Sequence, residues 1–320
     1  MESATRTAIW PETVREILAG DQAFAFARVT PAKGVVLTPL TNTGLTDPEA
    51  GKATPFTSSI GATKKFEKLA KYPKVAIAYH SRAHGFSERP EFVLLQGRGS
   101  HGPPSDRGWI ERNLEAWERY AGPRDVGPLF ERWLRYYHWR VPMEIDVERV
   151  VVWPDLACRG QPQVYGKPLP NQAPPPQTTP AKGTEPRMNH RRAARRIKKL
   201  PNRLLGWVGA DGYPIVTPVS VDGVEANGIV LEAAEGIDLP PGGRRGGLLG
   251  HSFARYTMGQ NQRKHTGWFE VIPGSRRVLY APHTESGYDL PTSMLLYRLA
   301  AGYVTRRGFR DAKKAGFAPD

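Results

Sequence analysis

The sequence predicts a mainly β protein with helices, an α+β fold built from two related halves. Three observations support this class. Gly and Pro are unusually frequent, at 33 and 30 of the 320 residues, which favours turns and short strands over long helices. Apolar runs of strand length recur along the chain and are separated by turn residues. A polar, proline-rich stretch divides two segments that resemble each other.

The likeness between the two segments is clearest at a hairpin. Residues 22–40, QAFAFARVTPAKGVVLTPL, align without a gap with residues 201–219, PNRLLGWVGADGYPIVTPV. Each segment has an apolar run, a tight turn and a second apolar run that contains Thr-Pro, and each follows an expected helix. We therefore predict a duplicated domain, with domains at 1–158 and 189–320 joined by a proline-rich linker at 159–188. A chance match of two short apolar hairpins is the alternative.

The remaining elements follow from apolar periodicity, with spacings of three and four for helices and short apolar runs for strands. In the first half these patterns predict, beside the hairpin, helices at 11–20, 62–71, 109–120 and 129–138 and strands at 75–80, 91–101 and 143–153. In the second half they predict helices at 189–200 and 293–305 and strands at 228–234, 266–272 and 276–281.

Charge and cysteine content limit the classes of function. The net charge of +14 indicates an anionic partner, such as nucleic acid, an acidic membrane surface or a phosphorylated cofactor. The single cysteine, Cys158, excludes an intramolecular disulfide and a thiolate metal cluster, and no other metal-ligand pattern occurs. Neither a signal peptide nor an apolar run long enough for a membrane span is present, so we expect a cytoplasmic protein.

Residues 56–80, FTSSIGATKKFEKLAKYPKVAIAYH, have the pattern of a phosphate site. Hydroxyl groups end a short strand, and a helix with two cations in its first turn follows. Those cations oppose the helix dipole at a cost of about 0.3–1 kcal/mol, which a bound anion would offset. A solvated lysine-rich helix is the alternative. The candidate ligands are Thr57, Ser58, Ser59, Thr63, Lys64 and Lys65.

This order of residues resembles the phosphate-binding signature of the FMN-binding split barrel, the fold of pyridoxamine 5′-phosphate oxidases, flavin reductases and deazaflavin-dependent oxidoreductases. The resemblance implies tandem split β-barrels of the six-stranded Greek-key type that form an intrachain pseudo-dimer, with a flavin between the barrels. It implies that Lys64 and Lys65, with Ser58 and Ser59, bind the FMN phosphate. It also implies that the isoalloxazine ring lies against Val36, Leu37 and Thr38.

The sequence departs from the family pattern at three places. Lys33 stands near the position of a flavin-contacting arginine, and Phe92 stands where the oxidases tend to have glutamine. The second half also lacks the TKKFEKL…YPKV signature. We therefore expect the second half to wall the flavin ring, through Trp207, His251 or Trp268, and not to hold a cofactor of its own.

The resemblance implies an oxidoreductase that transfers hydride between FMN, or an 8-hydroxy-5-deazaflavin coenzyme, and a small organic substrate. No catalytic residue stands out, because in such enzymes the cofactor carries the redox chemistry. One alternative is a non-catalytic flavin- or haem-binding stress or carrier protein. Another is association with nucleic acid through the basic segment 187–203, although no specific nucleic acid motif occurs. We expect a monomer that is its own pseudo-dimer, or a homodimer.

Overall fold

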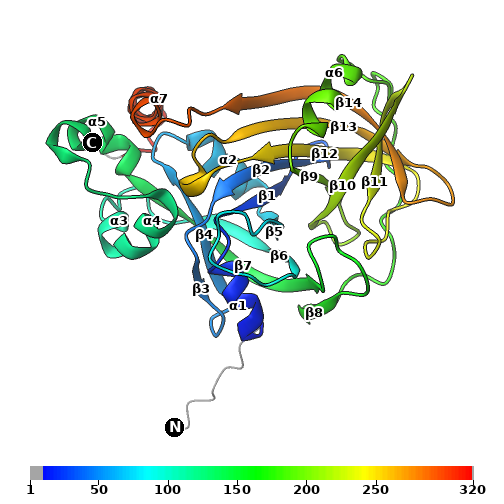
Figure 1. Ribbon diagram of the computed structural model, residues 1–320, viewed down its shortest axis with the longest axis horizontal. Helices are drawn as coiled ribbons and strands as arrows, with labels where there is room; N and C mark the ends of the chain where they lie inside the picture. Colours follow the sequence, from blue (N-terminus) through cyan, green and yellow to red (C-terminus); the bar gives the residue numbers. More distant parts are fainter. Residues whose placement is uncertain (1–9, 319–320) are drawn as a thin grey trace, which may run out of the picture.

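The computed structural model describes residues 10–318 and contains an open antiparallel sheet and a closed antiparallel barrel (Figure 1). The open sheet belongs to the first half and has the order β2-β1-β5-β6-β7-β4-β3, with β8 also paired to β7. Its strands are β1 (Ala23–Val29), β2 (Val35–Thr41), β3 (Leu45–Asp47), β4 (Lys52–Ser59), β5 (Lys74–Tyr79), β6 (Phe92–His101), β7 (Arg140–Trp153) and β8 (Gln163–Gly166). Its helices are α1 (Glu12–Leu18), α2 (Thr63–Lys71), α3 (Trp109–Arg112), α4 (Leu114–Ala121) and α5 (Gly127–His138).

The second half is a closed six-stranded barrel of order β10-β11-β14-β13-β12-β9. The prediction of a six-stranded antiparallel barrel with helices is therefore confirmed for this half. Its strands are β9 (Asn202–Val208), β10 (Pro214–Glu225), β11 (Gly228–Ala233), β12 (Gly243–Ser252), β13 (Asn261–Val271) and β14 (Arg277–Asp289). Its helices are α6 (His190–Lys198), the short 3-10 turn η1 (Arg255–Thr257) and α7 (Met294–Lys314).

Both predicted hairpins are present, and in each the turn contains a residue with positive φ. Lys33 has a φ of 57° in the turn between β1 and β2, and Gly212 has a φ of 82° in the turn between β9 and β10. The second turn is closed by a 2.8 Å hydrogen bond from the Gly209 N–H to the Tyr213 carbonyl. Turn chemistry thus fixed both hairpins correctly from the sequence.

The two halves differ at one seam. In the second half β10 pairs with β11, which closes the barrel. In the first half, as far as the structure describes it, β2 pairs with β1 alone, and β4 pairs with β3 and β7. The first half is therefore not the closed six-stranded unit that the sequence led us to expect. The open seam between β2 and β4 is where the candidate site lies.

Other elements also differ from the sequence prediction, among them the short strand β3, which was not predicted, and the helix predicted at 109–120, which is divided into α3 and α4. The strand β12 was not predicted, because its sequence GRRGGLLGHS is rich in glycine, which weakens strand propensity. The segment at 159–188 includes the short strand β8, which pairs with residues 149–152 of β7. Helix α7 continues to Lys314, nine residues beyond the predicted end. Neither Gly308 nor the basic residues around it interrupt the helix.

The halves share one buried core and several polar contacts. One core cluster includes Leu37 of β2 together with Leu204 and Leu249 of the barrel. Close by, the Arg149 guanidinium lies 2.8 Å from an Asp211 carboxylate oxygen, with the Arg149 side chain almost fully buried. The Gln96 amide donates a 2.6 Å hydrogen bond to the Pro214 carbonyl. These contacts place the open edge of β2 beside the barrel. No helix in residues 10–318 has the length and apolar character needed to cross a bilayer.

Candidate functional site

A cleft of about 430 Å³ lies at the open seam of the first half. Its floor comes from the ends of β2 and β4, and α4 and α5 form one side. The second half contributes η1, the end of β14 and part of α7. Figure 1 shows how this is arranged, since β13 and β14 extend from the barrel toward the helices of the first half. The volume is in the range of small-molecule sites.

Lys65 is the central cation of the cleft. Its Nζ donates a 2.7 Å hydrogen bond to Ser58 Oγ and lies 5.5 Å from the centre of the Phe56 ring. The pKa of Lys65 is lowered to about 8. Burial is the main cause, and the positive charges of Arg140, Lys264 and Arg28 add to it. An ammonium group in this place therefore lacks the counter-charge that would stabilise it.

Arg140, at the start of β7, is the second cation of the lining. Its Nε and Nη2 donate 2.9 Å hydrogen bonds to the hydroxyl and carbonyl oxygens of Thr57. Its guanidinium also lies 5.3 Å from the Trp117 ring centre and 5.2 Å from that of Tyr137. Burial lowers its pKa. All of these partners are neutral, so they orient the Arg140 guanidinium without compensating its positive charge.

The cluster of cations has no carboxylate partner within residues 10–318. Arg28, Lys65, Arg140 and Lys264 form none of the ion pairs found in this part of the chain. The described residues that line the cleft also include no Asp or Glu. Uncompensated buried cations are costly, so a site of this kind is suited to an anion.

The rest of the lining is aromatic and hydroxylic. The Tyr137 and Tyr297 hydroxyls lie 3.0 Å apart, and the Tyr288 hydroxyl donates a 2.7 Å hydrogen bond to Gln260 Oε1. Burial and the neighbouring Tyr137 raise the pKa of Tyr297, so it stays a neutral phenol. The cleft therefore combines a cationic end with flat aromatic surfaces, which suits a planar ring that carries an anionic group.

The turn η1 closes the cleft from the side of the second half. Tyr256 and Thr257 have φ values of 58° and 53°, a left-handed conformation that non-glycine residues seldom adopt. The Thr257 hydroxyl lies 2.5 Å from the Thr41 hydroxyl at the end of β2. Strained backbone of this kind persists where the surroundings hold it, and here it places Tyr256 and Thr257 in the wall of the cleft.

The structure brings together part of the predicted site. Thr57, Ser58, Ser59 and Lys65 all line the cleft. Thr63 is buried at the start of α2, and the Lys64 side chain is exposed, because adjacent helical residues point about 100° apart. On β2 the lining begins at Pro39, directly after the predicted Val36, Leu37 and Thr38. Of those three, Leu37 is buried in the core between the halves, and Val36 and Thr38 are partly exposed.

The predicted wall residues of the second half lie away from this cleft. None of Trp207, His251 and Trp268 lines the cleft. Trp207 is fully buried in the core, with its ring centre 5.9 Å from that of Phe269. The bulk of its side chain is used in filling the barrel. The second half instead provides Tyr256, Thr257 and Tyr288, which no local sequence pattern marks.

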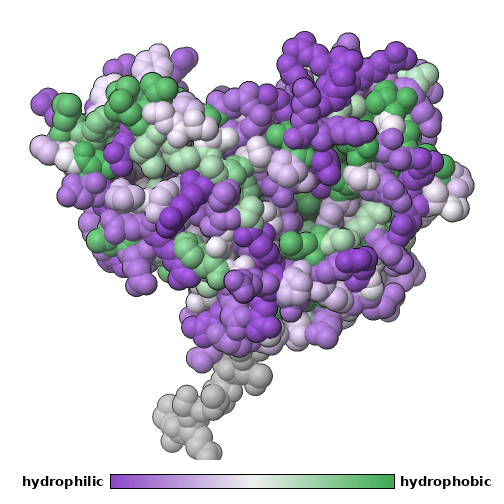
Figure 2. Space-filling view, viewed as in Figure 1, coloured by the Kyte–Doolittle hydropathy of each residue, from purple (hydrophilic) through white to green (hydrophobic). Residues whose placement is uncertain are grey.

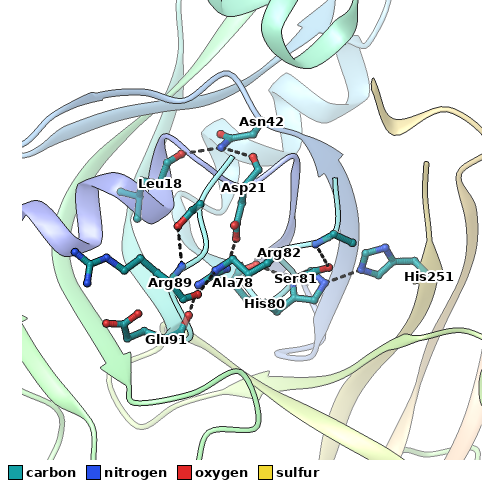
Figure 3. A network of polar contacts seen from close by, with 12 residues as sticks. Leu18, Asp21, Asn42, Ala78, His80, Ser81, Arg82, Arg89, Glu91 and His251 are labelled. Carbon is teal, nitrogen blue, oxygen red and sulfur yellow. Dashed lines mark hydrogen bonds and ion pairs between the residues drawn. The ribbon is translucent and has the colours of Figure 1, made fainter. Parts of the chain in front are cut away.

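His251 forms a buried pair with His80 at the boundary between the halves (Figure 3). His80 Nδ1 lies 2.9 Å from the Ala78 carbonyl, which can only accept, so this nitrogen carries the hydrogen. His80 Nε2 then accepts from His251 Nε2 at 2.7 Å. His251 Nδ1 is left without a partner in the described chain. Burial lowers the pKa of His80 to about 4 and that of His251 well below its usual value.

A polar network beside this pair fixes the end of β2. Arg82 donates a 2.6 Å hydrogen bond to Asp21 Oδ2, and burial raises the pKa of Asp21 to about 8 against the attraction of Arg82 (Figure 3). The Asn42 amide donates to the carbonyls of Leu18 and Asp21 at 2.7 and 2.9 Å. Asn42 also lines the cleft, so the network holds one part of its floor.

The basic segment predicted at 187–203 forms α6 and its flanks. Ala193, Ala194 and Ile197 are buried, so the arginines between them face outward. One of these, Arg196, forms a 3.0 Å ion pair with Glu285. The helix thus covers the barrel with its apolar side. Association of its cationic side with nucleic acid stays a prediction.

No protein-family model and no curated protein matches the chain. Several solved structures do. A haem binding protein from Mycobacterium smegmatis matches with 14% identity over 97% of this chain and 99% of that one, at a TM-score of 0.29. A pyridoxamine 5′-phosphate oxidase-related, FMN binding protein from Nostoc punctiforme matches with 14% identity over 46% of this chain and 82% of that one, at a TM-score of 0.29. A protein related to general stress protein 26 (pyridoxinephosphate oxidase family) from Clostridium acetobutylicum matches with 11% identity over 48% of this chain and 89% of that one, at a TM-score of 0.33.

The chain is similar to these three solved structures at 11–14% identity and at TM-scores of 0.29–0.33. Identities and TM-scores at these levels carry no argument about cofactor or activity. That argument depends on the geometry of the cleft.

Proposed function

We propose that the chain binds FMN in the cleft between its halves and acts as a flavin-dependent oxidoreductase on a small organic substrate. The observation that carries this proposal is the pairing of uncompensated cations with aromatic walls in one cleft. A phosphate group carries about −1.5 to −2 charges at neutral pH and accepts several hydrogen bonds, so it would neutralise Lys65 and Arg140 together.

The residues present fit such a cofactor. Lys65, Arg140, Ser58 and Thr57 would hold the phosphate, and the aromatic residues of the lining would pack against the ring. A bound flavin would supply hydride transfer, whereas the chain supplies binding and orientation. The 8-hydroxy-5-deazaflavin coenzyme also carries phosphate and is the alternative cofactor. The lining fits haem less well than FMN, because its described residues include no His, Cys or Met to bind iron.

We further propose that the two halves are a duplicated domain that forms an intrachain pseudo-dimer. Corresponding strands pair in the same way, since β1 pairs with β2 and β5, and β9 pairs with β10 and β12. The aligned residues Ala25 and Leu204 pair with Ala78 and Leu249. His80 and His251 stand two residues further on, in HSRA and HSFA. The two histidines that touch are therefore at equivalent positions, as residues on a two-fold axis would be.

Charge removal at Lys65 tests the phosphate site. Lys65→Ala should weaken FMN binding by at least about tenfold, because a charge-assisted hydrogen bond contributes about 1.5–3 kcal/mol. Lys68→Ala on the exposed side of the same helix is the matched control and should leave the affinity unchanged. Lys64→Ala measures separately whether the second predicted lysine also contacts the phosphate. Equal affinities for wild type and Lys65→Ala would place the phosphate elsewhere.

Spectra distinguish the cofactors and the non-catalytic alternative. We expect the purified or FMN-titrated protein to show flavin absorbance, and not a deazaflavin band or a haem Soret band. Reduction of the bound flavin by NADH or NADPH, followed by reoxidation with an organic acceptor, would support the oxidoreductase. A flavin that stays bound but is never reduced by these donors would assign a carrier role. A protein that takes up none of the three cofactors would end the proposal.

A further inference from the structure

Helix α7 exposes an unusual number of large apolar side chains. It has 21 residues, of which Gly302, Thr305 and Ala312 are buried. Its long apolar residues instead point outward, with exposed fractions between 45% and 64% for Leu295, Leu296, Leu299 and Tyr303. Single exposed leucines are common on protein surfaces, but a contiguous group on one helix marks an interaction site. Figure 2 shows apolar residues gathered at the upper left, over α5 and α7.

The same face of α7 becomes basic toward its end. Arg307, Arg310 and Lys314 are exposed and follow Tyr303 at spacings of four, three and four, which keeps them on the side of Leu295 and Leu299. The ridge of α7 is defined here as Leu295, Leu296, Leu299, Tyr303, Arg307, Arg310 and Lys314. Asp311 is the single acidic residue of the helix. Tyr303, at the junction, has the amphipathic side chain that is favoured at a membrane–water boundary.

The opposite face of α7 is firmly packed, so the ridge is held outward. Gly302 and Gly308 allow this close packing, because a Cβ at Gly302 would lie 2.0 Å from Trp133 Nε1 and Gly308 lies against the backbone of Gly61. Phe309 stacks on Tyr136 with ring centres 4.0 Å apart. Arg306 donates a 3.0 Å hydrogen bond to the Arg132 carbonyl. The exposed leucines are therefore part of a fixed surface.

We propose that the ridge of α7 is a docking surface for an anionic lipid bilayer. The apolar part would enter the interface, and the cations beyond it would lie over acidic headgroups. Charge favours a bilayer over a second copy of this chain, because both copies would carry +14 and the same cations beside the contact. An anionic surface complements both parts of the ridge at once. Since Tyr297 and Val304 of α7 also line the cleft, the bilayer would lie next to one wall of it.

Vesicle sedimentation with the full chain tests this proposal. The protein should bind phosphatidylcholine vesicles that contain phosphatidylserine and should not bind vesicles of phosphatidylcholine alone. Raising the salt concentration should weaken binding, because it screens the attraction of exposed charges. The double variants L295S/L299S and R307Q/R310Q should each reduce binding by at least about tenfold, since one removes the buried apolar groups and the other the charge.

Matched controls come from surfaces distant from α7. Val224→Ser removes an exposed apolar residue from β10, and K198Q/K199Q removes two exposed cations from α6. Both should bind vesicles as wild type does. No binding to phosphatidylserine vesicles overturns the proposal, as does binding that is lost in K198Q/K199Q and kept in R307Q/R310Q. A dimer in sedimentation equilibrium that L295S/L299S abolishes, without vesicle binding, would assign the ridge to a second copy and also overturn it.

Discussion

Lys65 occupies a position that is unfavourable for an isolated ammonium group. Burial and the charges of Arg140 and Lys264 lower its pKa to about 8. Its hydrogen bond within residues 10–318 goes to Ser58 Oγ, a neutral oxygen. A phosphate beside it would supply the missing counter-charge and raise the pKa again. Binding of a phosphorylated ligand should therefore be coupled to protonation of this residue.

The affinity for FMN should depend on pH in a specific direction. Between about pH 7 and about pH 8 most of Lys65 is protonated and the affinity should be near its maximum, and above about pH 8 the affinity should fall as the lysine loses its proton. Titrations between about pH 7 and about pH 9.5 measure this. Lys65→Arg, whose charge persists throughout this range, should remove the dependence. The same slope in wild type and Lys65→Arg would contradict the assignment.

The pair His80 and His251 should make the protein sensitive to acid. The pKa of His80 is about 4 in the folded chain and 6.5 in the unfolded chain, so the unfolded chain binds the proton more readily. Stability should be complete above pH 6.5 and should be lost as the pH falls toward about 4, by at most about 3 kcal/mol for this group.

Urea unfolding at a series of pH values gives the slope of this dependence. His251→Gln can still donate to His80, but it no longer takes up a proton, so it should flatten the curve. Some slope should remain, because His80 is kept in this variant and burial also lowers the pKa of His265 to about 4. A variant with the full wild-type slope would show that His251 contributes nothing to the pH dependence in this range.

Residues close together in the sequence were the ones that sequence reasoning could place. Ser58 and Lys65 belong to one strand–helix unit, and both line the cleft. Arg140 and Tyr256 come to the same cleft from distant elements, so no local pattern marks them. His251, which the sequence predicts beside the flavin ring, follows the glycines of GLLGHSF. Those glycines allow close packing between strands and halves, and the histidine meets His80 instead of the cleft.

Helix α7 depends on its glycines for close packing. In Gly302→Ala the new methyl group would meet the Trp133 ring at 2.0–2.6 Å. Overpacking of this kind costs about 1–3 kcal/mol, which outweighs the gain of up to about 1 kcal/mol from a better helix former. The melting temperature of Gly302→Ala should therefore fall. Gly223→Ala, whose Cβ meets no atom within 4 Å, is the control. An unchanged melting temperature in both variants would show that α7 is not held at this point.

Elements with clear periodicity or turn chemistry were predicted, and those with atypical composition were missed. The hairpins and α2 follow from local patterns that packing did not override. The strand β12 pairs with β13 along its whole length and with β9 over residues 247–251, and this pairing compensates for its four glycines. The strand β8 forms because residues 149–152 of β7 offer an unpaired edge. These strand pairings are tertiary contacts, which a short stretch of sequence does not reveal.

At the scale of the molecule, a buried ion pair connects the halves. The Arg149 guanidinium contacts Asp211 at 2.8 Å and the Gln96 side-chain oxygen at 2.6 Å. Arg149→Met should destabilise the chain by about 2–4 kcal/mol, because it leaves a partly buried carboxylate without its partner. Arg276→Met at an exposed ion pair should cost about 1 kcal/mol or less. Urea unfolding of both variants checks this, and equal losses would contradict a specific role for Arg149.

The chain should bind one flavin. The seam that forms the cleft in the first half is closed by pairing of β10 with β11 in the second half. The connection from β11 to β12 also contains no helix that corresponds to α2. Titration with FMN to saturation should therefore end at about one equivalent per chain, which follows from a single open seam. Two equivalents of equal affinity would contradict the proposed difference between the halves.

The cationic end of the cleft should recognise a phosphate attached to a flavin ring. The most direct test compares FMN with riboflavin, which has the same ring and no phosphate, in wild type and in Lys65→Ala. Wild type should prefer FMN by at least about tenfold, and Lys65→Ala should lose most of this preference while its riboflavin affinity is unchanged. Equal affinities of wild type for FMN and riboflavin, or a preference that survives in Lys65→Ala, would contradict it.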